Sequence, residues 1–108
     1  MIKDLIEQQR QRFIGLCQQH RVVKLYAFGS SVHGPFTKHS DVDLIVEVEQ
    51  GEPVETGERL WSFWDRMEDL LQRRVDLLTT SQVKNPVRRR SIEAGKQLIY
   101  DGSSGGLL

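Results

Sequence analysis

The chain has 108 residues, enough for one domain with a two-layer core but too few for a second substrate-binding domain. Lysine plus arginine and aspartate plus glutamate are equal at 15 each, so a net charge of zero gives no general attraction to nucleic acid or an anionic membrane. The single cysteine, Cys17, excludes a disulfide within the chain and fits a reducing compartment. No apolar stretch approaches the roughly 20 residues that span a bilayer. We therefore expect a soluble, cytoplasmic protein.

Apolar periodicity predicts the elements of the first half of the chain. Residues 2–19 repeat apolar side chains at helical spacing and predict one amphipathic helix. The β-rich run 22–28 predicts a strand that ends at Gly29, and one helical turn could follow Ser30. Residues 41–48 alternate apolar and polar side chains and predict a second strand.

The second half continues with a helix and a third strand. A helical stripe runs through 53–72, and the short run 74–79 is typical of a strand. A strand, a helix of this length and another strand predict a crossover connection within one sheet.

The C-terminal part gives weaker patterns. We expect a short polar helix or turn over 81–93 and an edge strand at 97–100. The last residues, 102–108, are rich in glycine and serine, which predicts a flexible tail. The folded domain would then cover residues 1–101.

Asp41 and Asp43 stand one residue apart at the head of the second strand. Alternate residues of a strand share a face at a spacing of about 6.6 Å, so both carboxylates can converge on a hard cation such as Mg²⁺. Two aspartates at this spacing also arise by chance. A solvated strand start is the alternative.

Asp76 strengthens the metal interpretation. It lies inside a run that otherwise suits a central strand, where an unpaired charge is costly. Three carboxylates on adjacent strands would repel one another and raise one another's pKa values unless a divalent cation lies between them. We therefore expect Asp41, Asp43 and Asp76 to form a metal site.

The turn after the first strand suits an anion. Gly29 would let the backbone approach a ligand closely, and Ser30 with the following amides could donate to phosphate oxygens. An ordinary turn is the alternative. Lys38 and His39 in the next loop could also face phosphates, or could simply be solvated.

Together these motifs resemble the nucleotidyltransferase superfamily that includes DNA polymerase beta and the aminoglycoside nucleotidyltransferases. The shared order is a Gly-Ser turn, an Asp-x-Asp pair and a distal aspartate, over about residues 22–79. The chain length and the phrase SDVDL at 40–44 are most similar to the minimal nucleotidyltransferase (MNT) family, whose small members often pair with HEPN ribonucleases as antitoxins. This resemblance implies an α+β fold of two layers, with a mixed sheet flanked by helices.

The resemblance also implies a chemistry. Two Mg²⁺ ions about 3.5 to 4 Å apart would be bridged by Asp41 and Asp43, with Asp76 binding one of them and helping to take a proton. A nucleoside monophosphate, expected to be AMP from ATP, would pass to a hydroxyl acceptor and pyrophosphate would leave. The residues that bind the nucleotide would be Gly29, Ser30, His33 and Lys38.

One position departs from the family pattern. Many members carry an arginine just before the second glycine, where this chain has His33, whose charge depends on pH. A module that neutralises its partner by contact, with a vestigial nucleotide site, is therefore the alternative to an enzyme. A structural or RNA-binding domain without a metal site is a third reading.

The short chain leaves no room for a domain that holds the acceptor, so we expect a partner molecule, most simply a HEPN-type toxin, to bring it. The sequence leaves open whether the chain forms a homo-oligomer or a hetero-oligomer. Trp61, Phe63 and Trp64 cannot all fit a narrow helical stripe, and Trp61 could face a partner. Burial of all three in the core is the alternative.

Charge is unevenly distributed along the chain. Residues 41–58 contain seven acids and no base, whereas 84–90 contain four bases and no acid. Either segment can be a solvated face. The basic segment could instead contact phosphates, an acidic partner or RNA. Because the net charge is zero, nucleic acid is the least expected of these partners.

Overall fold

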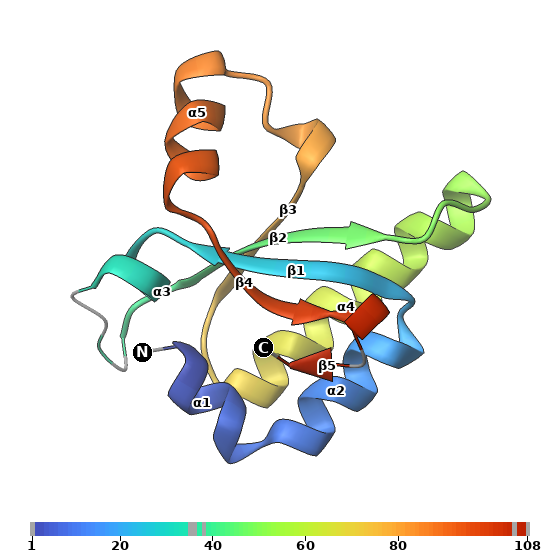
Figure 1. The fold of residues 1–108 in the computed structure, drawn as a ribbon. Coiled ribbons are helices and arrows are strands. Elements are labelled where there is room, and N and C mark those ends of the chain that lie inside the picture. Colours follow the sequence, from blue (N-terminus) through green and yellow to red (C-terminus); the bar gives the residue numbers. More distant parts are fainter. Residues whose placement is uncertain (1, 35–36, 38, 105, 108) are drawn as a thin grey trace.

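The computed structural model describes residues 2–34, 37, 39–104 and 106–107. Within them lies a five-stranded mixed sheet with strand order β3-β2-β1-β4-β5 and with helices on both faces (Figure 1). The α+β class with a mixed sheet flanked by helices is confirmed. In chain order the elements are α1 (Ile2–Gln8), α2 (Arg10–Gln19), β1 (Val22–Phe28), α3 (Ser30–His33), β2 (Val42–Val48), α4 (Pro53–Leu71), β3 (Val75–Thr79), α5 (Pro86–Gly95), β4 (Gln97–Asp101) and β5 (Gly106–Leu107), with 3-10 turns at Thr80–Gln82 and Gly102–Ser104.

The prediction of one helix over 2–19 is wrong, because the chain bends at Gln9 between α1 and α2. Gln9 has φ −132° and ψ 38°, outside the helical region. Its side-chain Nε2 donates to the carbonyl oxygen of Leu70 at 2.7 Å. The bend lets Ile6 on α1 and Phe13 on α2 both reach the core.

The predicted crossover from β2 through α4 to β3 is confirmed. β2 pairs with β3 in parallel and with β1 in antiparallel orientation. Glu52 caps the N-terminus of α4 by accepting from the backbone amides of Val54 and Glu55, and Pro53 follows at the first helical position. Gln72, with φ 55°, ends the helix in the left-handed region and turns the chain into β3.

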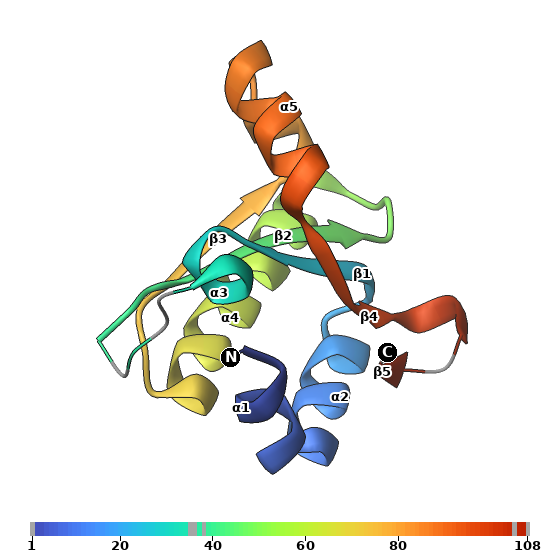
Figure 2. The same ribbon diagram turned by 60° about the vertical axis from the view of Figure 1, so that its left-hand side comes forward.

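The main core lies between the sheet and the helices α1, α2 and α4, which lie on one face of the sheet (Figure 2). The alternation in β2 explains this choice of face, since Val42, Leu44 and Val46 are at most 1 % exposed. On the helices, Phe13, Phe63 and Met67 are fully buried against them. Burial of each such side chain contributes about 1.5 to 3 kcal/mol.

The opposite face of the sheet carries α5, which lies apart from the other helices in both views (Figures 1 and 2). A second, smaller apolar cluster forms there from Phe28, Ile45, Val83 and Ile92. Asn85 caps α5 by accepting from the amides of Val87 and Arg88. The segment 81–93, predicted as a short helix or turn, is thus a 3-10 turn followed by a true helix.

Two predictions about sheet edges are wrong. The strand at 97–100 is not an edge strand, because β4 lies between β1 and β5. The run around Asp76 is not a central strand, because the parallel crossover places β3 at the edge, outside β2. At Val75 this edge is covered by α4, where Trp64 Nε1 donates to its carbonyl oxygen at 2.6 Å and Glu68 accepts from its amide at 2.9 Å.

β5 pairs two residues of the C-terminal segment with Tyr100 and Asp101 of β4. The prediction of a flexible tail at 102–108, and of a folded domain at 1–101, stays a prediction. None of the helices in the described part of the chain is both long enough and apolar enough to span a membrane.

Candidate active site

Asp43 and Asp76 are register partners on the parallel strands β2 and β3. Their neighbours Val42 and Val75 are buried toward the helical layer, so the two carboxylates point to the face that carries α5. Both aspartates are half-buried. The structure therefore brings together two of the three predicted carboxylates, on adjacent strands and on one face of the sheet.

Asp41 lies one residue before β2 and is exposed. It is near enough to Asp43 for its charge to act on that carboxyl. Burial raises the pKa of Asp43 above its ordinary value, and the charges of Asp76 and Asp41 raise it further, while the guanidinium of Arg88 lowers it. Of the predicted repulsion among the three carboxylates, the structure shows the part that acts on Asp43.

Gly29 is in direct contact with Asp43. Its φ is +64°, in the region that favours glycine, and a Cβ built there would lie 2.7 Å from Oδ2 of Asp43. Any larger residue would push this carboxylate aside. The predicted tight turn at Gly29 is confirmed, and the group that approaches its backbone is the side chain of Asp43.

Ser31, a residue that was not predicted to belong to the site, orients the same aspartate. Its side chain is fully buried, and its Oγ accepts a hydrogen bond from the backbone amide of Asp43 at 2.9 Å. This bond joins α3 to the start of β2. The sequence feature that could have indicated Ser31 is its place as the second serine of the Gly-Ser-Ser turn. This place lies one position further into a short helix that must pack on a strand.

The predicted nucleotide-binding residues are only partly placed. The backbones of Ser30 and His33 form part of α3, but their side chains lie outside the described part of the structure. Lys38 lies outside the described residues altogether. The assignment of Gly29, Ser30, His33 and Lys38 to a nucleotide stays a prediction.

Arg73, which was also not predicted to belong to the site, ties the loop before Asp41 to the end of α4. Its guanidinium donates to the carbonyl oxygen of Thr37, and to that of Ser40 at 3.4 Å. Ser40 also accepts from the amide of Thr37 through its Oγ at 2.9 Å. These bonds fix the backbone immediately before Asp41.

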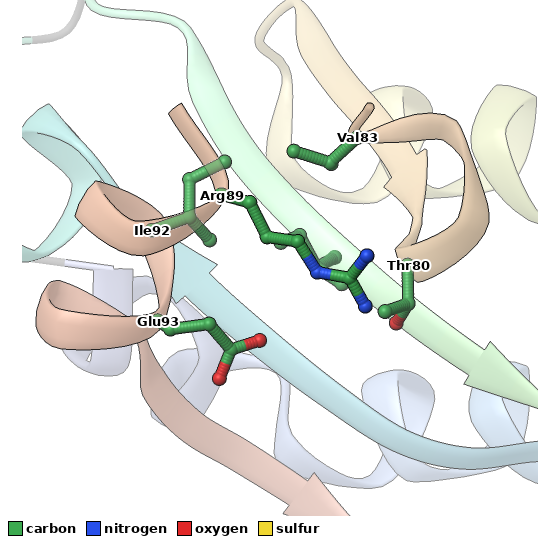
Figure 3. A pocket seen from close by; sticks show the side chains of 6 residues that line it. Thr80, Val83, Arg89, Ile92 and Glu93 are labelled. Carbon is green, nitrogen blue, oxygen red and sulfur yellow. The ribbon is translucent and has the colours of Figure 1, made fainter. Parts of the chain in front are cut away.

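The basic N-terminal turn of α5 lies on the carboxylate face of the sheet. Arg88 acts electrostatically on Asp43 from this helix. Arg89 lies beside it and extends across a hollow of only about 10 Å³ toward Thr80 (Figure 3). Such a hollow holds at most one water molecule, so this hollow is too small for a nucleotide.

The donor set fits a hard divalent cation. Carboxylate oxygens are the ligands that Mg²⁺ prefers, and a cation beside Asp43 would offset the repulsion from Asp76 and Asp41. Within the described residues, no three histidine, cysteine, aspartate or glutamate side chains are grouped closely enough to hold a metal. The Asp43 and Asp76 pair is assembled, and Asp41 would have to turn toward it.

Comparison with known proteins agrees with this geometry. A family model described as a nucleotidyltransferase domain matches residues 10–99, which include the turn at Gly29 and all three aspartates. The chain therefore belongs to the nucleotidyltransferase family, as its motifs predicted.

Two proteins of Methanocaldococcus jannaschii are similar over most of their length. One is 33% identical over 85 residues, which cover 79% of this chain and 82% of that protein. The other is 34% identical over 101 residues, which cover 92% of this chain and 93% of that protein. Both are named "Putative protein adenylyltransferase".

Solved structures share the fold. One described as a "putative minimal nucleotidyltransferase" has a TM-score of 0.62 at 26% identity and covers 90% of this chain and 95% of its own. A crystal structure described as a toxin-antitoxin with AMP-PNP has a TM-score of 0.62 at 18% identity, covering 84% and 72%. A third, described as a tri-AMPylated Shewanella oneidensis HEPN toxin in complex with its MNT antitoxin, has a TM-score of 0.57 at 16% identity, covering 91% and 74%. At these identities the last two show the fold alone.

Proposed function

We propose that this nucleotidyltransferase moves AMP from ATP to a hydroxyl group of a partner protein, and that the partner is a HEPN-type toxin that the transfer silences. The observation that carries the proposal is the pair Asp43 and Asp76, register partners on one face of the sheet with the Gly29 turn packed against Asp43. Support for the acceptor comes from relatives named as protein adenylyltransferases. Support for the partner comes from a solved neighbour described as an AMPylated HEPN toxin with an MNT antitoxin.

In the proposed reaction the acceptor hydroxyl oxygen forms a bond to the α-phosphorus of ATP. The bond from that phosphorus to the oxygen bridging to the β-phosphate breaks, and pyrophosphate leaves. Magnesium ions, when bound, would neutralise the triphosphate and make the acceptor hydroxyl easier to deprotonate. Asp41, Asp43 and Asp76 would hold them.

The other roles belong to the residues around the carboxylates. Asp76 would accept the hydroxyl proton, and Gly29 with the amides of α3 would hold the triphosphate. Arg88 would contribute positive charge from α5. A cytoplasmic location fits a protein that uses ATP on an intracellular partner.

The direct test is transfer of label from ATP labelled at the α-phosphate, with magnesium and a HEPN partner protein. We expect label on the partner, loss of label when Asp41→Asn is combined with Asp43→Asn, and little change in Glu47→Gln, which alters a carboxylate further along β2. No transfer by the wild-type chain, or transfer that survives the double substitution, would contradict the proposal.

A binding module without catalysis is the second candidate, favoured by His33 just before the second glycine, where the family motif leads us to expect arginine. It predicts that the double aspartate variant still binds its partner and still suppresses toxicity. Calorimetric titration with magnesium and a non-hydrolysable ATP analogue separates both candidates from a plain structural domain. If neither magnesium nor the ATP analogue binds at millimolar metal, the structural domain is favoured.

A further inference from the structure

The outer face of α4 carries a surface that the candidate active site does not use. Among the described residues, the large apolar side chains that are exposed are Val54 (65 %), Trp61 (73 %) and Val87 (78 %). Val54 and Trp61 both belong to α4 and stand seven residues apart, about two helical turns, so they share one face of the helix. Apolar side chains of this size that line up on one exposed face mark an interaction surface.

Trp61 and Trp64 line two adjoining hollows on this surface. Their ring centroids are 6.3 Å apart and their planes are inclined by 59°. One hollow, of about 200 Å³, is completed by Asp65 and Glu68. The other, of about 220 Å³, is bordered by apolar side chains that include Leu77 of the edge strand β3. The surface thus offers an acidic hollow and an apolar hollow side by side.

The charge on this face of α4 has one sign. Glu58 lies between Val54 and Trp61 at helical spacing, and Asp65 follows Trp61 by four residues, so both acids stand on the same face. Within the described residues, neither hollow is lined by a basic side chain. Helical geometry directs Arg59 and Arg66 to the opposite side of the helix. An exposed tryptophan flanked by carboxylates, in hollows that no described basic side chain lines, is complementary to a cation with an apolar stem.

We propose that this α4 face binds a basic segment of a partner protein. An arginine or lysine side chain enters the acidic hollow, where its stem packs on the tryptophan rings and its charge meets Asp65. An adjacent apolar side chain of the same segment fills the second hollow beside Leu77. The inference does not depend on nucleotide transfer, because a purely contact-based binding module would need such a surface equally.

Other occupants fit less well. RNA and anionic membranes would be repelled by the carboxylates. A second copy of this chain could offer Val87 and the basic residues that follow it on α5. If that contact were head-to-tail and did not close into a ring, it would leave one unsatisfied surface at each end of an open chain of copies. It would also occupy the basic turn that faces Asp43.

The chain provides its own reporter for a test. Its two tryptophans are Trp61 and Trp64, so the tryptophan fluorescence comes from the proposed surface alone. The probe is a peptide of about 12 residues with leucine and arginine on one helical face, and the matched peptide carries citrulline in place of arginine. We expect a saturable fluorescence change with the arginine peptide, weakened by salt, and at least about tenfold weaker binding of the citrulline peptide.

Substitutions on the protein locate the site. Asp65→Asn and, by calorimetry, Trp61→Ala should each weaken peptide binding at least about fivefold. The matched controls Glu55→Gln, on another side of α4, and Val87→Ala, on α5, should bind as the wild type does. Both target side chains are exposed, so the variants should keep the wild-type melting temperature.

Three results would overturn the inference. The first is equal binding of the two peptides, and the second is unchanged peptide binding by Asp65→Asn and Trp61→Ala. The third is a concentration-dependent self-association of the free chain that Trp61→Ala abolishes. That third result would assign the surface to a second copy. Nucleotide transfer does not enter this assay. A chain that binds the peptide but transfers no nucleotide would keep this inference and reject the proposed function.

Discussion

A methyl group on Gly29 would lie 2.7 Å from Oδ2 of Asp43, closer than carbon and oxygen can approach without displacement. The glycine that ends β1 and the aspartate near the start of β2, a proposed metal ligand, are therefore matched to each other. The same turn continues to Ser31, whose Oγ accepts from the amide of Asp43. Two residues of this one segment, Gly29 and Ser31, thus set the side chain and the backbone of this aspartate respectively.

Gly29→Ala should abolish transfer while leaving the chain folded. For alanine at this position, the positive φ alone lowers the free energy of unfolding by about 1 to 2 kcal/mol. The new methyl group would also move the Asp43 carboxylate. Gly15→Ala on α2 is the matched control, because an added Cβ would meet no other described part of the structure within 4 Å beyond its own stretch of helix, and alanine favours the helix by about 1 kcal/mol. Urea unfolding and label transfer measure both effects. A Gly29→Ala variant with full transfer would show that the contact does not matter.

Ser31→Ala should destabilise the chain by about 1 to 3 kcal/mol, because the amide of Asp43 loses its acceptor in a partly buried place. We also expect kcat for transfer to fall more than KM for ATP rises, since the serine positions Asp43 and does not touch the nucleotide. Ser91→Ala, which changes an exposed serine on α5, should alter neither quantity. Equal unfolding midpoints for Ser31→Ala and the wild type would contradict the role.

Asp43→Asn should stabilise the metal-free chain at neutral pH. Burial, Asp76 and Asp41 raise the pKa of Asp43 above its ordinary value of 3.8. The folded chain therefore holds this proton where the unfolded chain has lost it, so the group's contribution to stability is full below pH 3.8 and is lost as the pH rises through the raised pKa. Asparagine does not ionise, and the variant avoids that loss.

The measurement is urea unfolding in a chelating buffer at acidic and at neutral pH. The stability gain of Asp43→Asn should be present at neutral pH and should vanish at acidic pH. Glu47→Gln is the control of opposite sign, since Glu47 opposes Lys24 across β1 and β2 and its loss should cost about 0.2 to 1 kcal/mol. A neutral-pH loss of stability in Asp43→Asn would mean that a cation is not needed to offset the charge.

Arg88→Ala should raise KM for ATP about tenfold, because one charge-assisted hydrogen bond contributes about 1.5 to 3 kcal/mol. The structural reason is that its guanidinium acts on Asp43 from the first turn of α5. Arg88→Lys should recover part of the affinity, and Arg90→Ala on the same helix should leave KM near the wild-type value. An effect of equal size in Arg88→Ala and Arg90→Ala would indicate general attraction by the basic segment.

The strands and the crossover helix were predictable from the sequence because their patterns are local. The alternation of apolar and polar residues predicts β2 and its buried face. Glu52 followed by Pro53 indicates the start of α4. The aspartate pair across β2 and β3 was predictable once parallel strands were expected, since strands joined by a crossover lie side by side. Gly29 was predictable as a turn residue, although its contact with Asp43 was not.

The features that could not be predicted from the sequence depend on interactions between distant parts of the chain. The bend at Gln9 depends on a hydrogen bond to Leu70, 61 residues away. Arg73 reaches back to Thr37, and no periodicity in either segment indicates this contact. Asp76 was placed on a central strand because its neighbours are apolar, yet those residues are covered by the side chains of α4 at a sheet edge. Exposure of Trp61 was one of two alternatives, and the structure decides for it.

The proposed function depends on the carboxylates of Asp43 and Asp76 supporting nucleotide transfer to a protein. The most direct measurement is the intact mass of a HEPN partner after incubation with this chain, ATP and magnesium. We expect a mass increase of one or more AMP units with the wild-type chain, and an increase that is at least about a hundredfold slower with Asp43→Asn or Asp76→Asn. A partner whose mass does not change with the wild-type chain, or changes equally fast with both variants, would contradict it.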